Sequence, residues 1–287
     1  MMTLFVRARA QLSFWISRNG RPNVVFDQHL CSYERVELAE RHQLIVARLQ
    51  RSTRVSVAEL ADAVDTSEVT IRRDLEQLAG QGVLRRVRGG AVSVLPHGDE
   101  TPFALRELQA VEEKRRIAEL VGELVGDGEV VVVDSGTTGL AVARVLAGRR
   151  LTAMPLSLPA ADALAGRPPT RVVLPGGELR PGELTATGPL AEAGIRALRF
   201  DTAVITCCGL SVAAGLTVHD LGDAAVKSAA IRAASRVVLV ADSTKFARTA
   251  MAVVCALSDV DVLVTDRHAP ADAVDAITAL GVQVHRG

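Results

Sequence analysis

Apolar residues follow helical spacing in the first third of the chain. Ile71, Leu75 and Leu78 lie at i, i+4 and i+7, which predicts one buried stripe on a helix that begins after the N-cap residue Ser67. Similar spacing recurs upstream, and a Gly-Gly pair divides the apolar residues downstream. The pattern predicts three helices, over residues 36–52, 57–64 and 68–82. It also predicts an extended piece over residues 54–56 and a pair of strands over residues 83–92.

Beyond residue 110, short β-branched runs alternate with helical segments. This alternation predicts an α/β domain with a mostly parallel sheet that carries helices on both faces. The predicted strands are Val130–Val133, Leu151–Met154, Arg171–Leu174, Thr202–Thr206, Val237–Ala241 and Val262–Thr265. The predicted helices are 112–128, Leu140–Leu146, Leu190–Ala197, Ala224–Ala234 and Ala271–Leu280.

The change of pattern predicts four parts. Residues 1–35 lack periodicity, and we expect a disordered or mis-annotated extension, with a natural start near Val36. The three helices and the strand pair over residues 36–94 have the order of a winged helix-turn-helix. Residues 95–109 are polar and contain proline, as a hinge-like linker does, and residues 110–287 would form the α/β domain.

Composition narrows the class of protein. The 33 basic and 33 acidic residues balance, but residues 1–95 carry a net charge of +4 and the rest −4, which agrees with a polyanionic partner for the N-terminal part. No apolar run reaches the roughly 18–20 residues that span a bilayer, and no signal peptide is evident. Four cysteines without C-x-x-C spacing predict neither disulfides nor zinc. We expect a cytoplasmic protein without metal, cofactor or membrane.

The helix-turn-helix order indicates double-stranded DNA as the partner. An α-helix fits the major groove, where residues near its N-terminal end reach base edges, and arginines of a wing hold the backbone or a narrow minor groove. The alternative is a small helical domain with a solvated charged face, but the complete ordered set favours DNA. The candidate contacts are Ser67, Thr70, Arg72 and Arg73 on the third helix and Arg85, Arg86 and Arg88 on the wing.

Polar turns follow several predicted strands, where ligands of parallel sheets bind. The turn Asp134-Ser135-Gly136-Thr137-Thr138 opens a helix, whose free N–H groups suit an anion. Only three of the 33 basic residues are lysines, and two of them lie where they could meet one cleft. Each turn alone could be ordinary, but together they predict an anion site. The candidates are Asp134, Ser135, Gly136, Thr137, Thr138, Gly176, Gly177, Glu178, Lys227, Asp242 and Lys245.

Specific motifs resemble one family. The segment SVAELADAVDTSEVTIRRDLEQLAGQGVLRRVRGGAV resembles the N-terminal signature of the DeoR family of bacterial repressors, and EEKRRIAELV, VVVDSGTTGLAVA, VVLPGGELR, TGPLAE and VVLVADSTKFAR resemble its sensor domain. The resemblance covers about residues 36–285. It implies a sensor fold similar to ribose-phosphate isomerase, and a phosphorylated sugar or catabolic intermediate that weakens operator binding.

The resemblance also implies roles for individual residues. Thr70, Arg72 and Arg73 would lie on the recognition helix, and residues 134–138 would form a phosphate loop. Gly176, Gly177 and Glu178 would line the pocket, while Lys227 and Lys245 would neutralise charge.

The chain departs from the family pattern at three places. Pro155-Leu156, followed by Ser157, stands where a Thr-Asn pair is typical, Cys207-Cys208 replaces small residues, and Ala247 replaces a glycine. Without the Asn amide, we expect a less hydroxylated effector.

Two other functions compete with a repressor of a carbohydrate operon. One is an isomerase-like enzyme on sugar phosphates, with Asp134, Glu178 or Asp242 as base and a lysine as electrophile. A fused DNA-binding module argues against catalysis, so we expect no enzyme. The other is a ligand-insensitive DNA binder. Because operators are commonly read by symmetric proteins, we expect a homo-oligomer, a dimer or tetramer, assembled mainly through the α/β domain.

Overall fold

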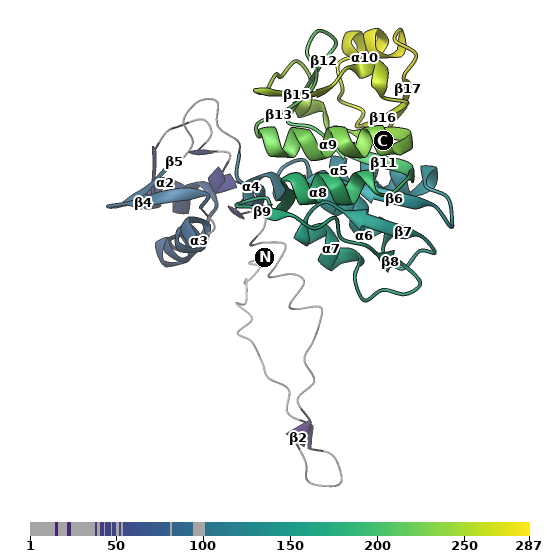
Figure 1. The fold of residues 1–287 in the computed structure, drawn as a ribbon. Helices are drawn as coiled ribbons and strands as arrows, with labels where there is room; N and C mark the ends of the chain where they lie inside the picture. Colours follow the sequence, from purple (N-terminus) through teal and green to yellow (C-terminus); the bar gives the residue numbers. More distant parts are fainter. Residues whose placement is uncertain are drawn as a thin grey trace, which may run out of the picture.

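The computed structural model describes residues 15–16, 22–23, 38, 41–42, 44–46, 48–49, 52, 54–80, 82–93 and 101–287. The extension expected over residues 1–35 therefore lies outside the described residues, apart from the paired strands β1 (Trp15–Ile16) and β2 (Pro22–Asn23). Figure 1 shows a smaller N-terminal body and a larger C-terminal body, with the short helix α4 (Phe103–Glu107) between them.

The N-terminal body has the elements of a winged helix-turn-helix. The described residues between 38 and 49 are helical. A three-stranded antiparallel sheet has the order β3-β5-β4. The labelled elements are β3 (Arg54–Ser56), α2 (Val57–Ala63), α3 (Glu68–Gly80), β4 (Leu84–Val87) and β5 (Gly90–Ser93).

The predicted apolar stripe of α3 forms the centre of this body. Ile71, Leu75 and Leu78 are fully buried and pack in one cluster with Ile45 of the first helix. The same cluster contains Leu105 of α4, although α4 lies inside the segment predicted to be a linker. The core of the N-terminal body is therefore completed by a residue from beyond the wing.

Seven parallel strands form the sheet of the C-terminal body, in the order β17-β16-β14-β11-β6-β7-β8. Each of the six predicted strands overlaps one of them. The strands are β6 (Val130–Val133), β7 (Thr152–Pro155), β8 (Arg171–Val172), β11 (Phe200–Thr206), β14 (Ala234–Val240), β16 (Val262–Thr265) and β17 (Gln283–Arg286).

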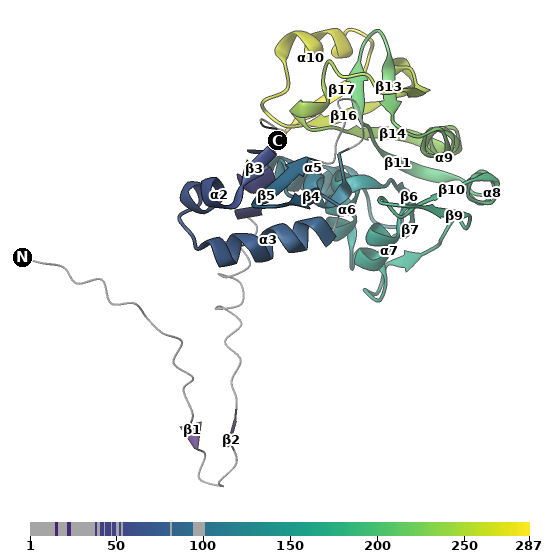
Figure 2. The ribbon, with the colours of Figure 1, turned by 90° about the vertical axis from the view of Figure 1, so that its left-hand side faces the viewer.

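Helices cover both faces of this sheet, as predicted (Figure 2). Successive residues of β6 alternate between the faces: Val131 and Val133 belong to one apolar core and Val132 to the other. The first core includes α5 (Val111–Leu124), α6 (Gly136–Leu146) and α7 (Leu158–Leu164). The second includes α8 (Pro189–Arg196), α9 (Leu221–Ala233) and α10 (Ala271–Thr278).

Two small antiparallel sheets were not predicted. A hairpin joins β9 (Glu178–Arg180) to β10 (Thr185–Thr187), and a separate sheet has the order β12-β13-β15. Its strands are β12 (Gly209–Ser211), β13 (Gly215–Val218) and β15 (Ala252–Cys255).

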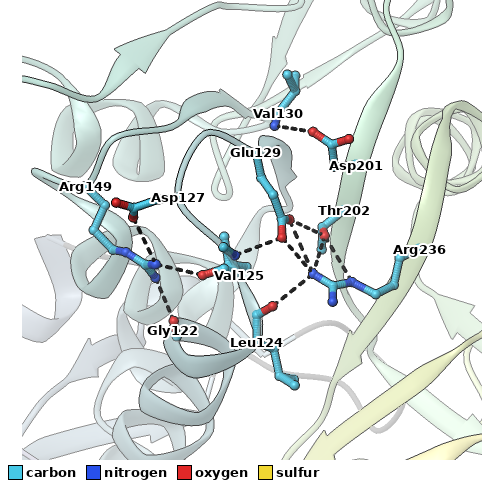
Figure 3. A network of polar contacts seen from close by, with 11 residues as sticks. Gly122, Leu124, Val125, Asp127, Glu129, Val130, Arg149, Asp201, Thr202 and Arg236 are labelled. Atoms are coloured by element: carbon cyan, nitrogen blue, oxygen red, sulfur yellow. Dashed lines mark hydrogen bonds and ion pairs between the residues drawn. The ribbon is translucent and has the colours of Figure 1, made fainter.

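A polar network holds α5 to the amino ends of the strands (Figure 3). The Arg236 guanidinium on β14 donates to Thr202 Oγ1 at 2.7 Å and to the Leu124 carbonyl at 3.0 Å, and it pairs with Glu129 at 3.2 Å. Arg149 also donates to carbonyls near the end of α5. These contacts thus fix the amino ends of the strands, while the carboxyl ends of the strands carry the candidate site.

Candidate DNA-binding surface and effector site

The start of α3 presents the predicted DNA-contacting residues to solvent. Ser67 caps the helix as predicted, because its Oγ accepts the Thr70 N–H at 3.2 Å. Arg72 and Arg73 are exposed and Thr70 is half-buried. Arg72 is tied to Glu68 one turn earlier at 2.6 Å, so this contact must open before its guanidinium can reach a base.

The wing also exposes its arginines. Arg85 and Arg86 lie on β4 and Arg88 in the following turn, all three exposed. Gly90 is required here by a close approach, because a Cβ at this position would lie 2.0 Å from the Val55 carbonyl oxygen. The glycine lets β5 pass against β3, and the basic wing depends on that contact.

One acidic residue of the recognition helix has a structural role that the sequence did not reveal. Asp74 is buried, and the Arg41 Nε donates to its carboxylate at 2.6 Å while His42 lies 3.5 Å away. Burial lowers the pKa of His42, although Asp74 opposes that shift. The Asp74 carboxylate therefore locks α3 to the first helix, which contains Arg41 and His42. Val69, also on α3, is 59% exposed and was not singled out from the sequence.

The candidate effector site lies where the strand order of the large sheet reverses. The chain starts with β6, adds β7 and β8 on one side, and then places β11, β14, β16 and β17 on the other. Loops that leave β6 and β11 therefore diverge at their carboxyl ends, which is where open parallel sheets bind ligands. Asp134 directly follows β6 at this point and is fully buried.

Asp134 joins the two strands. Its Oδ2 accepts the backbone N–H and the hydroxyl of Thr206, both at 2.8 Å, and its Oδ1 accepts the Ser135 N–H at 2.7 Å. Lys227 of α9 forms a buried ion pair with the same carboxylate and lies 3.5 Å from Asp223. Burial acts to lower the pKa of Lys227, but its attraction to the two carboxylates outweighs burial and raises that pKa.

The structure thus gives Lys227 a different setting from the one predicted. Its charge is balanced by Asp134 and its side chain is buried, so the ammonium fixes the turn that follows β6 instead of lying open to solvent.

The predicted phosphate loop forms the first turn of α6. Ser135 is the N-cap residue, and Gly136 has a φ of +81°, which the absence of a Cβ makes accessible. Thr137 and Thr138 follow and are buried. Gly139 allows the tight turn, because a Cβ there would lie 2.2 Å from the Asp134 carbonyl oxygen. The N-terminal N–H groups of an eleven-residue helix point to this place.

Asp242 and Lys245 lie after the neighbouring strand β14, as predicted. Asp242 is buried and caps the short 3-10 helix η1 (Ser243–Lys245), and Lys245 is half-buried at its end. Asp266, which the sequence did not single out, follows β16 and accepts the Ser243 N–H at 2.6 Å. Acidic residues thus hold the loops at three strand ends.

The Gly-Gly turn packs against β10 and α8. Gly177 contacts Thr187 of β10 and Ala191 of α8, since a Cβ on it would lie 2.4 Å from the Thr187 carbonyl oxygen. Glu178 is exposed at the start of β9. A second carboxylate of this region, Glu183 in the turn after β9, is buried and forms an ion pair with Arg106.

Three cations, Lys114, Arg106 and Lys245, lie close enough for their charges to interact, and the Arg106 guanidinium lies beside Gly136. Lys114 on α5 is buried and donates to the carbonyls of Arg106 and Gln109 at the end of α4. Burial lowers the pKa of Lys114 to about 8; Asp242 opposes this shift, and the nearby charges of Lys245 and Arg106 reinforce it. Lys114 and Arg106 were not among the predicted site residues, because neither lies at a strand end.

The three departures from the family pattern have structural counterparts. Leu156 is fully buried in an apolar core. Burial raises the pKa of the Cys207 thiol to about 12, which makes this thiol a poor nucleophile. Ala247 has a φ of +54°, a conformation that favours glycine.

Other ligand classes find little support in the described part of the chain. A cavity of about 450 Å³ lies at the amino ends of the strands, between α9, β14 and β15, away from the phosphate loop. Among the described residues, no group of His, Cys, Asp and Glu side chains could hold a metal ion. Within the same residues, no helix combines the length and the apolar character needed to cross a bilayer.

Two family models match the two bodies of the chain. Residues 41–96 match the model of the DeoR-like helix-turn-helix domain, and residues 109–267 match that of the DeoR C terminal sensor domain. Ribose 5-phosphate isomerase A of Methanocaldococcus jannaschii aligns with a TM-score of 0.37 and 16% identity, over 48% of this chain and 55% of that chain.

Curated relatives align over most of their length. The HTH-type transcriptional regulator GlpR of Haloferax volcanii is 34% identical, over 87% of this chain and 98% of the relative. The glycerol-3-phosphate regulon repressor of Escherichia coli is 33% identical, over 85% and 97%. These relatives are transcriptional regulators, so the prediction of a regulator in preference to an enzyme is confirmed. The chain belongs to the DeoR family: it is a transcriptional regulator with a helix-turn-helix that binds DNA and a C-terminal sensor domain that binds an effector.

Proposed function

We propose that the protein represses a carbohydrate operon in the cytoplasm and leaves its operator when a small phosphorylated effector binds at residues 134–138. The observation that carries this proposal is the α6 N-terminus at the reversal of strand order, with Lys114 and Lys245 near Arg106, whose guanidinium lies beside Gly136. Backbone N–H groups and lysine point charges suit a phosphate. The role of Gly176, Gly177 and Glu178 would be indirect: they would set the conformation of the turn that carries Glu183.

The effector is proposed to be a short phosphorylated polyol. The site lacks a polar side chain at Leu156, whose burial leaves no group there to bond a sugar hydroxyl. A relative is named for a glycerol-3-phosphate regulon, which agrees with a compound of this size. The regulator is proposed to act as a dimer or tetramer, because two-fold operators are read by paired recognition helices.

A gel-shift titration on the promoter upstream of its own gene tests this function. Operator binding by the full chain that glycerol 3-phosphate releases at lower concentration than fructose 1-phosphate would support both repression and the effector class. Binding that no phosphorylated compound releases would contradict the sensor role and favour a ligand-insensitive DNA binder. Ketose–aldose conversion of a sugar phosphate by the protein would revive the isomerase alternative.

Lys245→Ala should leave operator affinity unchanged and weaken the response to effector about tenfold, the effect of one lost charge-assisted hydrogen bond. Lys245 lies in the sensor domain, so the recognition helix and the wing stay intact. The effector concentration for half-release in the gel shift measures this change. Loss of operator binding by a folded Lys245→Ala protein would contradict the assignment.

Effector affinity should fall about tenfold as the pH rises through about 8. Below that pH the Lys114 ammonium is charged and attracts an anion; above it the charge is lost, while a phosphate monoester stays doubly charged over this range. Calorimetric titration at several pH values between 7 and 9 measures the change. Lys114→Arg keeps its charge at all these pH values, so its effector affinity should not change with pH. If the affinity of this variant fell as steeply as that of the natural protein, Lys114 would be excluded as the origin of the pH dependence.

A further inference from the structure

The helix α4 belongs to both bodies of the molecule at once. Leu105 is buried in the apolar core of the DNA-binding body, together with the recognition-helix residues Ile71 and Leu75. The next residue, Arg106, is directed to the sensor domain, where it forms a buried ion pair with Glu183. Adjacent residues of one helical turn are therefore held by the two domains. Figure 1 shows α4 between these two bodies.

Arg106 also lies against the phosphate loop. Its Nη1 is 3.7 Å from the position that a Cβ on Gly136 would occupy. Its Nε donates to the Thr101 carbonyl at 3.0 Å, and its guanidinium lies over the Phe103 ring, 5.9 Å from the centroid. These contacts hold the guanidinium beside the first turn of α6, with Glu183 on another side of it.

We propose that Arg106 is an effector ligand, and that a bound phosphate takes its guanidinium from Glu183 and so transmits effector binding to the DNA-binding body. This inference rests on the proposed function, since it requires a phosphorylated effector at residues 134–138.

The competition follows from charge and geometry. A phosphate monoester carries nearly two negative charges at neutral pH, whereas the Glu183 carboxylate carries at most one. A guanidinium binds a phosphate through two parallel N–H bonds, and it is already beside Gly136. The phosphate therefore attracts the Arg106 guanidinium more strongly than Glu183 does. When the guanidinium binds the phosphate, the ion pair between Glu183 and α4 is broken.

The mechanical consequence follows from the position of Leu105. When Arg106 changes partners, the turn of α4 that carries Leu105 must adjust, and Leu105 belongs to the same apolar core as the recognition helix. Coupling between the two sites then needs no contact between effector and DNA, because each favours a different position of one shared helix.

Three variants of the full chain test this proposal. Glu183→Gln removes the carboxylate that competes with the phosphate for Arg106. The double variant Arg106→Gln with Glu183→Gln removes both charges and keeps two amides that can form a hydrogen bond with each other. Arg144→Gln is the matched control. Arg144 forms an exposed pair with Glu107 at 3.1 Å, so this control also breaks an ion pair between α4 and α6, away from Gly136. Calorimetry with glycerol 3-phosphate and inorganic phosphate gives affinity, and the gel shift gives operator release.

We expect Glu183→Gln to bind glycerol 3-phosphate about tenfold more tightly than the natural protein, and the double variant about tenfold more weakly. Operator release should shift in the same directions, while Arg144→Gln changes neither within about twofold. A purely structural role for the pair predicts no gain in Glu183→Gln. Equal affinities in all four proteins would overturn this inference alone, and failure of the natural protein to bind either probe would overturn the proposed function with it.

Discussion

Asp134→Asn should lower the free energy of unfolding by about 3 kcal/mol, because it leaves the Lys227 charge buried without its main partner. Asp223, 3.5 Å from the ammonium, limits the loss to the lower end of the range for a broken buried pair. Urea unfolding followed by circular dichroism measures the change.

A double variant is the control for this prediction. Asp134→Asn with Lys227→Met removes both charges, and replacement of a whole buried pair costs much less than removal of one partner. It should therefore recover most of the lost stability. If Asp134→Asn alone unfolds at the natural urea concentration, the pair does not hold the loop between β6 and β11.

Arg73→Ala should weaken operator binding by about 1–3 kcal/mol if its guanidinium contacts a base. Arg73 is exposed near the N-terminal end of α3, so its removal should leave unfolding unchanged. The gel shift with operator and with unrelated DNA measures the effect, which should be larger on the operator.

Arg115→Ala is the matched control, because it removes the same charge from the exposed face of α5 in the sensor domain. Its operator affinity should equal that of the natural protein. Equal losses by Arg73→Ala on operator and unrelated DNA would show a backbone contact in place of base recognition.

The sequence predicted those elements whose burial imposes a regular pattern. Val130–Val133 and Val262–Thr265 are β6 and β16, strands inside the sheet with apolar neighbours on both faces. The Ile71 stripe was found because three turns of α3 face one core. The edge strand β17 (Gln283–Arg286) was missed, since half of its surroundings are solvent and its residues are mostly polar.

The candidate site was predicted in part for a similar reason. A glycine and hydroxyl residues after a strand indicate a loop that can hold an anion, and this information is local. The Lys227–Asp134 pair joins residues 93 apart in the sequence. Arg106 and Glu183, which also form an ion pair, are likewise far apart along the chain. Such pairings depend on tertiary structure, which spacing along the chain does not encode.

The burial of Leu105 limits how this regulator could exchange parts with others during evolution. A DNA-binding segment that ends at residue 94, at the end of the wing, leaves behind a residue of its own hydrophobic core. Recombination at that boundary would combine an incomplete core with a foreign helix. A productive crossover lies after residue 108, where the recognition module carries α4 with it and its new sensor must supply a matching acidic residue for Arg106.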